Sequence, residues 1–308
     1  MSMNFKWILS LASSSLMFAL LQFSATAHAG AFYKESWEDG VLYKPSLYVA
    51  GGCYNKKDHG YNSFEIVKTY ARHGKRSLRA EAHGMDKNSV CSAKHLVNEV
   101  KTRNEIFYMV DDLDLGRVPH GREIWLKTSY YIPSNEGTFN SWWNKGKRFI
   151  ILQMNGAGNK STPEVHFLLG PKGNVDIEMT HSVTVKEQMI KDHKRVKFAS
   201  NSWNDVVIRW KRSWKNDGIL QIWINGEMVV DKMGPTAIRD KPFGKFKTGI
   251  YFGGDKRPQE YVIYIDNFTL GDKNNTYESF AFDNGVQEAS IPTVSPKPPK
   301  NISFEVDQ

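Results

Sequence analysis

Short runs rich in β-branched and aromatic residues recur along this chain, and each is bounded by glycine, proline, asparagine or aspartate. Glu123–Ile132 stops at Pro133, and Val165–Leu169 is followed by the turn-forming stretch Gly170–Asn174. Such runs between turn formers are typical of β-strands. The same pattern occurs at Ser77–Ala82, Arg148–Met154, Val175–Met179, Asp205–Lys211, Ile219–Ile224, Phe246–Tyr251, Tyr261–Phe268 and Asp266–Gly271.

This succession of strands, without a long amphipathic helix, predicts an all-β fold. Many short strands joined by turns form sandwiches and jelly rolls. We therefore expect a β-sandwich or jelly roll over residues 30–273. The charged segment Lys186–Lys197 is expected to form at most a short helix or a loop. Residues 274–308 turn polar and Pro-rich, which is typical of an extended tail.

The first 29 residues have the pattern of a secretory signal peptide. Lys6 precedes the largely apolar stretch Trp7–Phe23, which is short for a membrane span, and Ala27–Ala29 fits a small-x-small cleavage site. We therefore predict a secreted or periplasmic protein, with a retained anchor as the alternative. Only two cysteines occur, Cys53 and Cys91. Oxidising conditions favour a disulfide between them, and two free buried thiols are the alternative.

The charge of the chain adds a class of partner to this picture. Lys and Arg total 41 against 33 Asp and Glu, a formal net charge of +8. A basic protein can bind nucleic acid, an anionic membrane or an acidic polymer, and a scattered surplus of Lys can also serve only solubility. No zinc-finger spacing, RNP-type strand or Walker loop occurs, so nucleic acid is not favoured.

The strand Phe246–Tyr251 carries the first candidate chemistry. Gly249 and Tyr251 lie on the same face of a strand, so a bare spot is predicted beside a phenol. A flat ligand such as a sugar ring could lie against the bare spot, and a phenol can transfer a proton. Lys247 precedes Tyr251 by four residues and is expected to point into the same groove.

Three segments in chain order resemble the strands of jelly-roll polysaccharide lyases. Arg103–Ile106 (Arg-Asn-Glu-Ile) is similar to their Arg-x-Glu-Leu strand. Gln153–Asn155 (Gln-Met-Asn) stands in place of their Gln-x-His, and Phe246–Tyr251 (Phe-Lys-Thr-Gly-Ile-Tyr) resembles their Phe-Lys-x-Gly-x-Tyr. From about Phe32 to Gly271 the chain therefore resembles the family of heparin lyase I, glucuronan lyase and related alginate lyases.

The resemblance implies a concanavalin-like β-jelly-roll sandwich of two antiparallel sheets. It also implies β-elimination on an anionic, uronate-containing polysaccharide. Such a lyase removes the C5 proton beside a carboxylate, which must be neutralised while a base takes the proton and an acid protonates the leaving oxygen. The implied roles are Tyr251 as proton handler, Arg103 as the cation, and Gln153 and Asn155 as amide donors. The predicted substrate-binding residues are Lys247, Arg79, Glu105, Trp143 and Lys147.

Asn155 departs from the family pattern, which has His at this place. Asn cannot act as a base, so three interpretations are open. Tyr251 can serve as both base and acid while Asn155 only neutralises the carboxylate. Alternatively His166 on the adjacent strand is the base, or the activity has been lost and the groove only binds. The last possibility corresponds to a non-catalytic carbohydrate-binding module or adhesin.

A glycoside hydrolase on a similar sandwich is a further alternative. It needs two carboxylates on one strand face, which Asp176 and Glu178 supply. However, Asn174 stands where a third acid of the Glu-x-Asp-x-x-Glu pattern is expected. No cofactor or metal cluster is predicted; a structural calcium, which some relatives use, has no visible loop here. We expect a monomer whose partner is an anionic polysaccharide.

Overall fold

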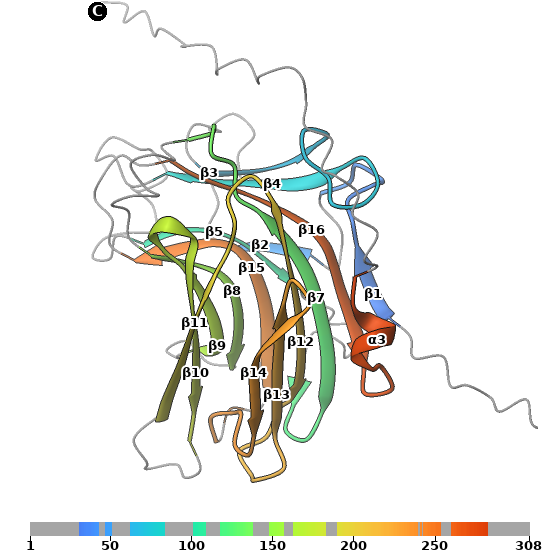
Figure 1. The fold of residues 1–308 in the computed structure, drawn as a ribbon, viewed down its shortest axis with the longest axis vertical. Helices are drawn as coiled ribbons and strands as arrows, with labels where there is room; N and C mark the ends of the chain where they lie inside the picture. Colours follow the sequence, from blue (N-terminus) through green and yellow to red (C-terminus); the bar gives the residue numbers. More distant parts are fainter. Residues whose placement is uncertain are drawn as a thin grey trace, which may run out of the picture.

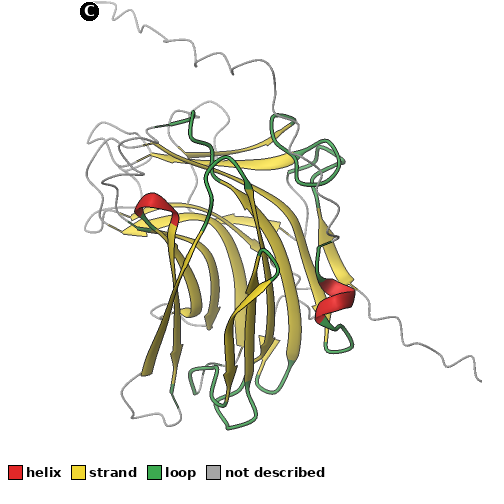
Figure 2. Ribbon diagram, in the orientation of Figure 1, coloured by secondary structure: helices red, strands yellow, loops and turns green. Residues whose placement is uncertain are grey.

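The computed structural model of the chain describes residues 31–42, 47–50, 62–83, 101–108, 118–137, 148–156, 163–182, 190–239, 241, 243–253 and 260–282. Two eight-stranded sheets, which we call sheet A and sheet B, lie against each other, and their strands curve (Figure 1). Within each sheet, every pairing found between named strands is antiparallel. Strands make up most of the described chain (Figure 2), so the predicted two-sheet jelly-roll sandwich is confirmed.

Sheet A has the order β14-β13-β12-β7-β16-β4-β3, and β1 pairs with β16. Its strands are β1 (Ala31–Glu35), β3 (Asn62–Val67), β4 (Ser77–His83), β7 (Glu123–Tyr131), β12 (Trp203–Lys211), β13 (Ile219–Ile224), β14 (Glu227–Met233) and β16 (Glu260–Asp272).

Sheet B has the order β11-β10-β9-β8-β15-β5-β2, and β6 pairs with β15. Its strands are β2 (Leu47–Ala50), β5 (Lys101–Tyr108), β6 (Val118–Pro119), β8 (Phe149–Gly156), β9 (Pro163–Leu169), β10 (Asn174–His181), β11 (Ile190–Lys197) and β15 (Phe243–Gly253). Within the described residues, the helical elements are the 3-10 turn η2 (Pro171–Gly173) and the short helix α3 (Tyr277–Phe280).

The core between the sheets is built from alternate residues of each strand. On β15 the side chains of Phe246 and Ile250 are fully buried in this core. Thr248 lies between them, and its hydroxyl forms a hydrogen bond of 2.8 Å with the hydroxyl of Tyr130 on β7. This bond joins the two sheets, and it fixes which residues of β15 face away from the core. We call that face of sheet B its outer face.

The predicted helix or loop at Lys186–Lys197 is wrong, because Ile190–Lys197 forms β11 and pairs with β10 over all eight residues. Its charges suit an edge strand, where like-charged side chains discourage pairing with another molecule. Val196 packs against the core, and Asp192 accepts a bond of 2.5 Å from Lys232 of sheet A. Alternation with a single apolar side chain in the core is too weak a strand signal.

Two further boundaries differ from the sequence prediction. Asp266–Gly271 is the end of the 13-residue strand β16 and not a separate strand, and a bulge at Asn267 (φ 54°) interrupts its register with β7. Residues 274–282, which were predicted to belong to the tail, pack on sheet A. Phe280 is 2% exposed and its ring lies 5.9 Å from that of Trp125.

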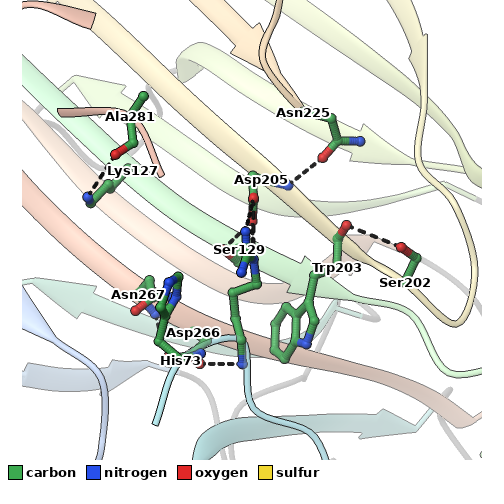
Figure 3. Close-up of polar contacts among 11 residues, drawn as sticks. His73, Lys127, Ser129, Ser202, Trp203, Asp205, Asn225, Asp266, Asn267 and Ala281 are labelled. Atoms are coloured by element: carbon green, nitrogen blue, oxygen red, sulfur yellow. Dashed lines mark hydrogen bonds and ion pairs between the residues drawn. The ribbon is translucent and has the colours of Figure 1, made fainter. Parts of the chain in front are cut away.

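A polar network covers part of the outer face of sheet A (Figure 3). Ser129 donates to Asp205 at 2.7 Å, and the guanidinium of Arg72 makes bonds of 2.8–3.3 Å to the same carboxylate. Asp266 accepts backbone N–H bonds from residues 72, 73 and 267. The loop 71–76 is thereby tied to β12 and β16 of sheet A.

Candidate functional site

A row of polar residues crosses five neighbouring strands of sheet B. Directly paired residues of antiparallel strands point to the same face. The row therefore lies on one face, and the alternate positions on each strand, such as Phe246 and Met154, fill the core. In strand order from β15 to β11 its members are Lys247, Gln153, His166, Glu178 and His193.

Most of this row is shielded from solvent although it lies on the outer face. Gln153 is 2% exposed, and Lys247 and His166 are each 7% exposed. Buried polar and charged groups need partners, and shielded clusters of them are typical of functional sites. The structure thus brings Gln153, Lys247 and His166 together as neighbours on one shielded face.

Gln153 donates a hydrogen bond to Glu105, a residue of β5 that is 1% exposed. The bond passes across β15, since β15 lies between β8 and β5. Glu105 pairs with Gly249, which is buried and has φ +138°. The bare spot predicted at Gly249 is therefore not open to a sugar ring. Glu105 and Lys247 are diagonal neighbours, within reach of long side chains.

Two bulges bring Tyr251 closer to the polar row. Tyr251 is partly exposed and pairs with Ile150 of β8, which pairs in turn with Leu168 of β9. Lys247 and Tyr251 are four positions apart on β15, and their partners on β8 are three positions apart. On β9, His166 and Leu168 are two positions apart. Bulges shorten one strand relative to the next and redirect side chains. Measured on β9, Tyr251 therefore lies level with a residue two positions from His166, nearer to the row than its separation on β15 suggests.

The imidazole of His166 is held by a carboxylate. Its Nε2 lies 3.2 Å from Oε2 of Glu178, while its Nδ1 is buried and has no hydrogen-bond partner among the described residues. Burial lowers the pKa of His166, Glu178 raises it and Lys191 lowers it again, and the resulting pKa lies below the usual value. The neutral imidazole is therefore favoured at neutral pH.

Asn155 and Tyr251 lie at different levels of the sheet. Asn155 is partly exposed and pairs with Lys245, which precedes Tyr251 by six residues on β15. On β8, where the same separation is five positions (Asn155 to Ile150, the partner of Tyr251), this corresponds to roughly 16 Å at about 3.3 Å per residue. The structure thus does not bring Asn155 beside the phenol. Arg103 pairs with Tyr251 through the backbone, but its side chain lies outside the described part of the structure.

The acids of the glycoside hydrolase alternative are both engaged. Asp176 is fully buried and contacts Arg148, His193 at 2.8 Å and Arg195 at 2.7 Å. Burial raises the pKa of Asp176, but its hydrogen bonds from Arg195 and His193 and the charge of Arg148 lower it further, to below the usual value. Such a carboxylate remains ionised and cannot act as a general acid, which counts against this alternative.

Arg79 is apart from the other candidates. It lies on β4 of sheet A and contacts Glu81, Glu136 at 3.1 Å and Glu260 at 3.9 Å. Leu78 and Ala80, its neighbours, face the core, so Arg79 points to the outer face of sheet A. Burial lowers the pKa of Arg79, but the neighbouring carboxylates, Glu81 first, raise it above its usual value. The geometry is that of a structural ion-pair cluster, on the opposite side of the sandwich from the polar row.

Other predictions fall on residues that the structure does not describe. Trp143, Lys147, Cys53, Cys91 and the leader 1–29 are among them. Sequence reasoning also missed the cations of β11. Lys191, His193, Arg195 and Lys197 recur at every second position, which is a strand signal with one basic face.

Two searches within the described residues were negative. They contain no group of three or more His, Cys, Asp or Glu side chains that could hold a metal ion. They also contain no helix with the length and apolar character needed to cross a membrane.

Comparison with known proteins agrees with this architecture. No curated protein sequence matches the chain. The endo-β-1,4-glucuronan lyase of the fungus Trichoderma reesei superposes with a TM-score of 0.59 at 12% identity, covering 80% of this chain and 97% of that one. The PL-14 alginate lyase of Aplysia kurodai gives 0.49 at 11% identity, with 79% and 99% covered. An alginate lyase of Pseudomonas aeruginosa gives 0.43 at 13% identity, with 71% and 89% covered.

The first of these likenesses shows a shared fold, in line with the sandwich described above. A family described as polysaccharide lyase matches residues 50–269, which is more than half of the chain and includes the polar row and Tyr251. The resemblance predicted from the three strand motifs is thus confirmed, and the chain belongs to the polysaccharide lyase family.

Proposed function

We propose that this lyase cleaves a uronate-containing, anionic polysaccharide by β-elimination, with Tyr251 as the proton-transfer residue. The observation that carries the proposal is the shielded row of Lys247, Gln153 and His166 on the same face of sheet B as a partly exposed tyrosine. A merely structural outer face would have solvated polar groups or apolar ones. The fold shared with a glucuronan lyase, an enzyme named for a uronate polymer, supports the same substrate class.

The chemistry of β-elimination explains the residue types in the row. The C5 proton of a uronate is barely acidic while the adjacent carboxylate is fully charged. A cation and amide donors that stabilise the developing enolate-like dianion lower the barrier to its removal. Lys247 supplies the ammonium, and Gln153 supplies an amide whose orientation is fixed by its bond to Glu105. We expect both to act on the uronate carboxylate.

Tyr251 is the better candidate for the proton transfer itself. Tyr251 is partly exposed to solvent. In His166, by contrast, Nδ1 is buried and Nε2 is paired with Glu178. A base must come within hydrogen-bond reach of the proton that it removes. This supports the interpretation in which Tyr251 is both base and acid. His166 then acts as a positioning residue, whose neutral ring keeps the charge of the row low.

The proposal includes export, with residues 1–29 removed and Cys53 joined to Cys91. The apolar leader and the cysteine content of the mature chain motivate it. Determination of the mature N-terminus and a thiol titration of the exported protein test both points. A start at Gly30 and no titratable thiol are expected.

The proposed reaction is tested by ultraviolet absorbance, because β-elimination leaves an unsaturated uronate. The purified protein is mixed with heparin, heparan sulfate, hyaluronan, glucuronan, polymannuronate or polyguluronate, and Tyr251→Phe is the matched control. A rise on one polymer that the control lacks supports the proposal and identifies the substrate. Silence on every polymer, with retention on one immobilised polymer, supports a binding protein on the lyase fold instead.

A further inference from the structure

Three basic side chains converge on one buried carboxylate at the β11 edge of sheet B. The carboxylate is that of Asp176, which is fully buried. Arg195 bonds to it at 2.7 and 3.4 Å, His193 at 2.8 Å, and Arg148 makes an ion pair with its other oxygen. The cations come from β11 and from the residue that precedes β8, so two distant segments build this cluster.

The cluster presents its basic side chains to solvent and hides its carboxylate. The side chains of Arg148, His193 and Arg195 are 46%, 47% and 53% exposed, while Asp176 is 0% exposed. Each guanidinium uses one or two of its five N–H donors on Asp176. Donor capacity therefore remains at the exposed surface, in a geometry that the buried carboxylate holds in place.

A glycine makes this arrangement possible. Gly170 follows β9, and an added Cβ there would lie 2.9 Å from Cγ of Arg148. The Arg148 side chain passes closely over this position on its way to Asp176. Because Gly170 has no side chain, Arg148 has room to reach Asp176 across the outer face of sheet B.

The local charge balance is positive. Side chains at alternate positions of β11 share a face, so Lys191 and Lys197 lie on the same side as Arg195. With Arg148 these make four permanent cations, and the carboxylates facing them from β10 are Asp176 and Glu178. An exposed surface of this kind attracts anions.

The cluster lies at the level of Tyr251 in the sheet. Tyr251 pairs with Ile150, Ile150 with Leu168, and Leu168 with Asp176. Three strand spacings separate β15 from β10, which is about 14 Å at about 4.8 Å per spacing. A polysaccharide that crosses the strands from Tyr251 toward the sheet edge would reach these cations a few sugar residues away.

We propose that Arg148, His193 and Arg195 form a subsite for an anionic group, a carboxylate or a sulfate, on a sugar remote from the cleaved bond. The inference rests on the proposed function, because it assumes that an anionic polysaccharide lies across sheet B. Guanidinium groups bind both kinds of oxyanion through paired N–H donors. The subsite adds affinity for long chains and leaves the chemical step unchanged.

The decisive comparison is Arg195→Gln against Lys194→Gln. Both replace one exposed cation of β11, but Lys194 pairs with Ile177 and lies on the other face of the strand. On the polymer that the protein cleaves, Arg195→Gln is expected to raise KM about tenfold with kcat unchanged, the effect of losing a charged hydrogen bond. On oligosaccharides too short to reach β11 it should have no effect. Lys194→Gln should change KM for the polymer and for the short oligosaccharides by no more than about twofold.

Two further arms separate the possible outcomes. Arg195→Lys keeps the charge, so partial recovery of KM shows an electrostatic role, and thermal unfolding of each variant reports folding. Equal KM values for Arg195→Gln and Lys194→Gln on the polymer, or a loss that follows only the melting temperature, would overturn the subsite. Retention on immobilised polymer tests the subsite even if no polymer is cleaved, so a failure of the proposed reaction is distinguishable. If Arg195→Gln weakens binding to sulfate-free glucuronan, the subsite binds a carboxylate. If it weakens binding to heparin but not to glucuronan, the subsite binds a sulfate.

Discussion

Gln153 of β8 is hydrogen-bonded to Glu105 of β5, although β15 lies between their two strands. Both side chains are almost fully buried on the outer face of sheet B. The bond fixes the amide of Gln153 next to Lys247, its direct partner on β15. The positioning of the proposed carboxylate-binding groups thus depends on how closely three strands approach one another.

Gly249 controls that approach, and we predict that Gly249→Ala is strongly destabilising. The added Cβ would lie 2.2 Å from the carbonyl oxygen of Asn104, at a φ of +138° that other residues rarely adopt. We expect the free energy of unfolding to fall by about 1–3 kcal/mol or more. Chemical denaturation measures it, with Gly121→Ala as control, since Gly121 also has positive φ but nothing within 4 Å of its Cβ position. Equal losses for the two variants would show that backbone strain, and not the contact with β5, sets the requirement.

Substitutions at Tyr251 and His166 should differ in their effect on turnover. Tyr251→Phe removes the proposed proton-transfer group, and kcat is expected to fall about 10²- to 10⁴-fold, with the unfolding free energy changed by less than about 1.5 kcal/mol. His166→Asn alters the surroundings of the row and should reduce kcat by about tenfold. The two kcat values on the polymer identified by the absorbance panel provide the measurement. The opposite order, a severe loss at His166 and a mild one at Tyr251, would make His166 the base.

Much of the fold could be predicted from local patterns. Alternation and turn residues located β7, β8, β9, β10, β12 and β13 to within a few residues, since each has a strong apolar face. β11 was missed because its one core-facing apolar residue, Val196, is surrounded by charge. Local pattern cannot show that an edge strand draws its stability from a neighbour.

The candidate site could be predicted only as a set of separate residues. Gln153, His166 and Lys247 meet because three strands pair in a certain register, and two bulges decide how far Tyr251 lies from them. Neither the register nor the bulges have a clear signal in the chain. For the same reason Arg79 was grouped with residues of the other sheet, since a motif on β4 does not reveal which sheet the strand joins.

The segment 274–282 should contribute to stability and not to turnover. Phe280 is buried against Trp125, and Gly271 leaves room for its ring, since a Cβ there would lie 2.5 Å from Cε2 of Phe280. We expect Phe280→Ala to lower the unfolding free energy by about 3 kcal/mol, as for other buried aromatics. Glu278→Ala, an exposed position on the same helix, should change it by less than about 0.5 kcal/mol. Because sheet A carries the segment on its outer face, kcat should be unaffected; a loss of kcat in folded Phe280→Ala would link the segment to the site.

Asp266 should make the stability of the fold depend on pH. Burial raises the pKa of this carboxyl to about 7, although backbone N–H groups of residues 73, 72 and 267 lower it. An ordinary aspartate has a pKa of about 3.9 in an unfolded chain. Between about pH 4 and pH 7 the folded protein therefore retains a proton that the unfolded chain has lost. The favourable contribution of this protonated group to the unfolding free energy is present in full below about pH 4 and is lost as the pH rises to about 7.

The test compares the wild type with Asp266→Asn, whose amide has the shape and charge of the protonated carboxyl. Near pH 4 the two proteins should have similar unfolding free energies, and by pH 8 the wild type should have lost stability relative to the variant. Urea titrations at several pH values measure the difference in unfolding free energy between the two proteins. The contributions of the other titrating groups cancel in this difference because both proteins contain them. Because three amide donors surround Asp266, the opposite result is physically meaningful. If the wild type gains on Asp266→Asn as the pH rises, the backbone N–H bonds outweigh burial, and the loop 71–76 is held by an ionised carboxylate.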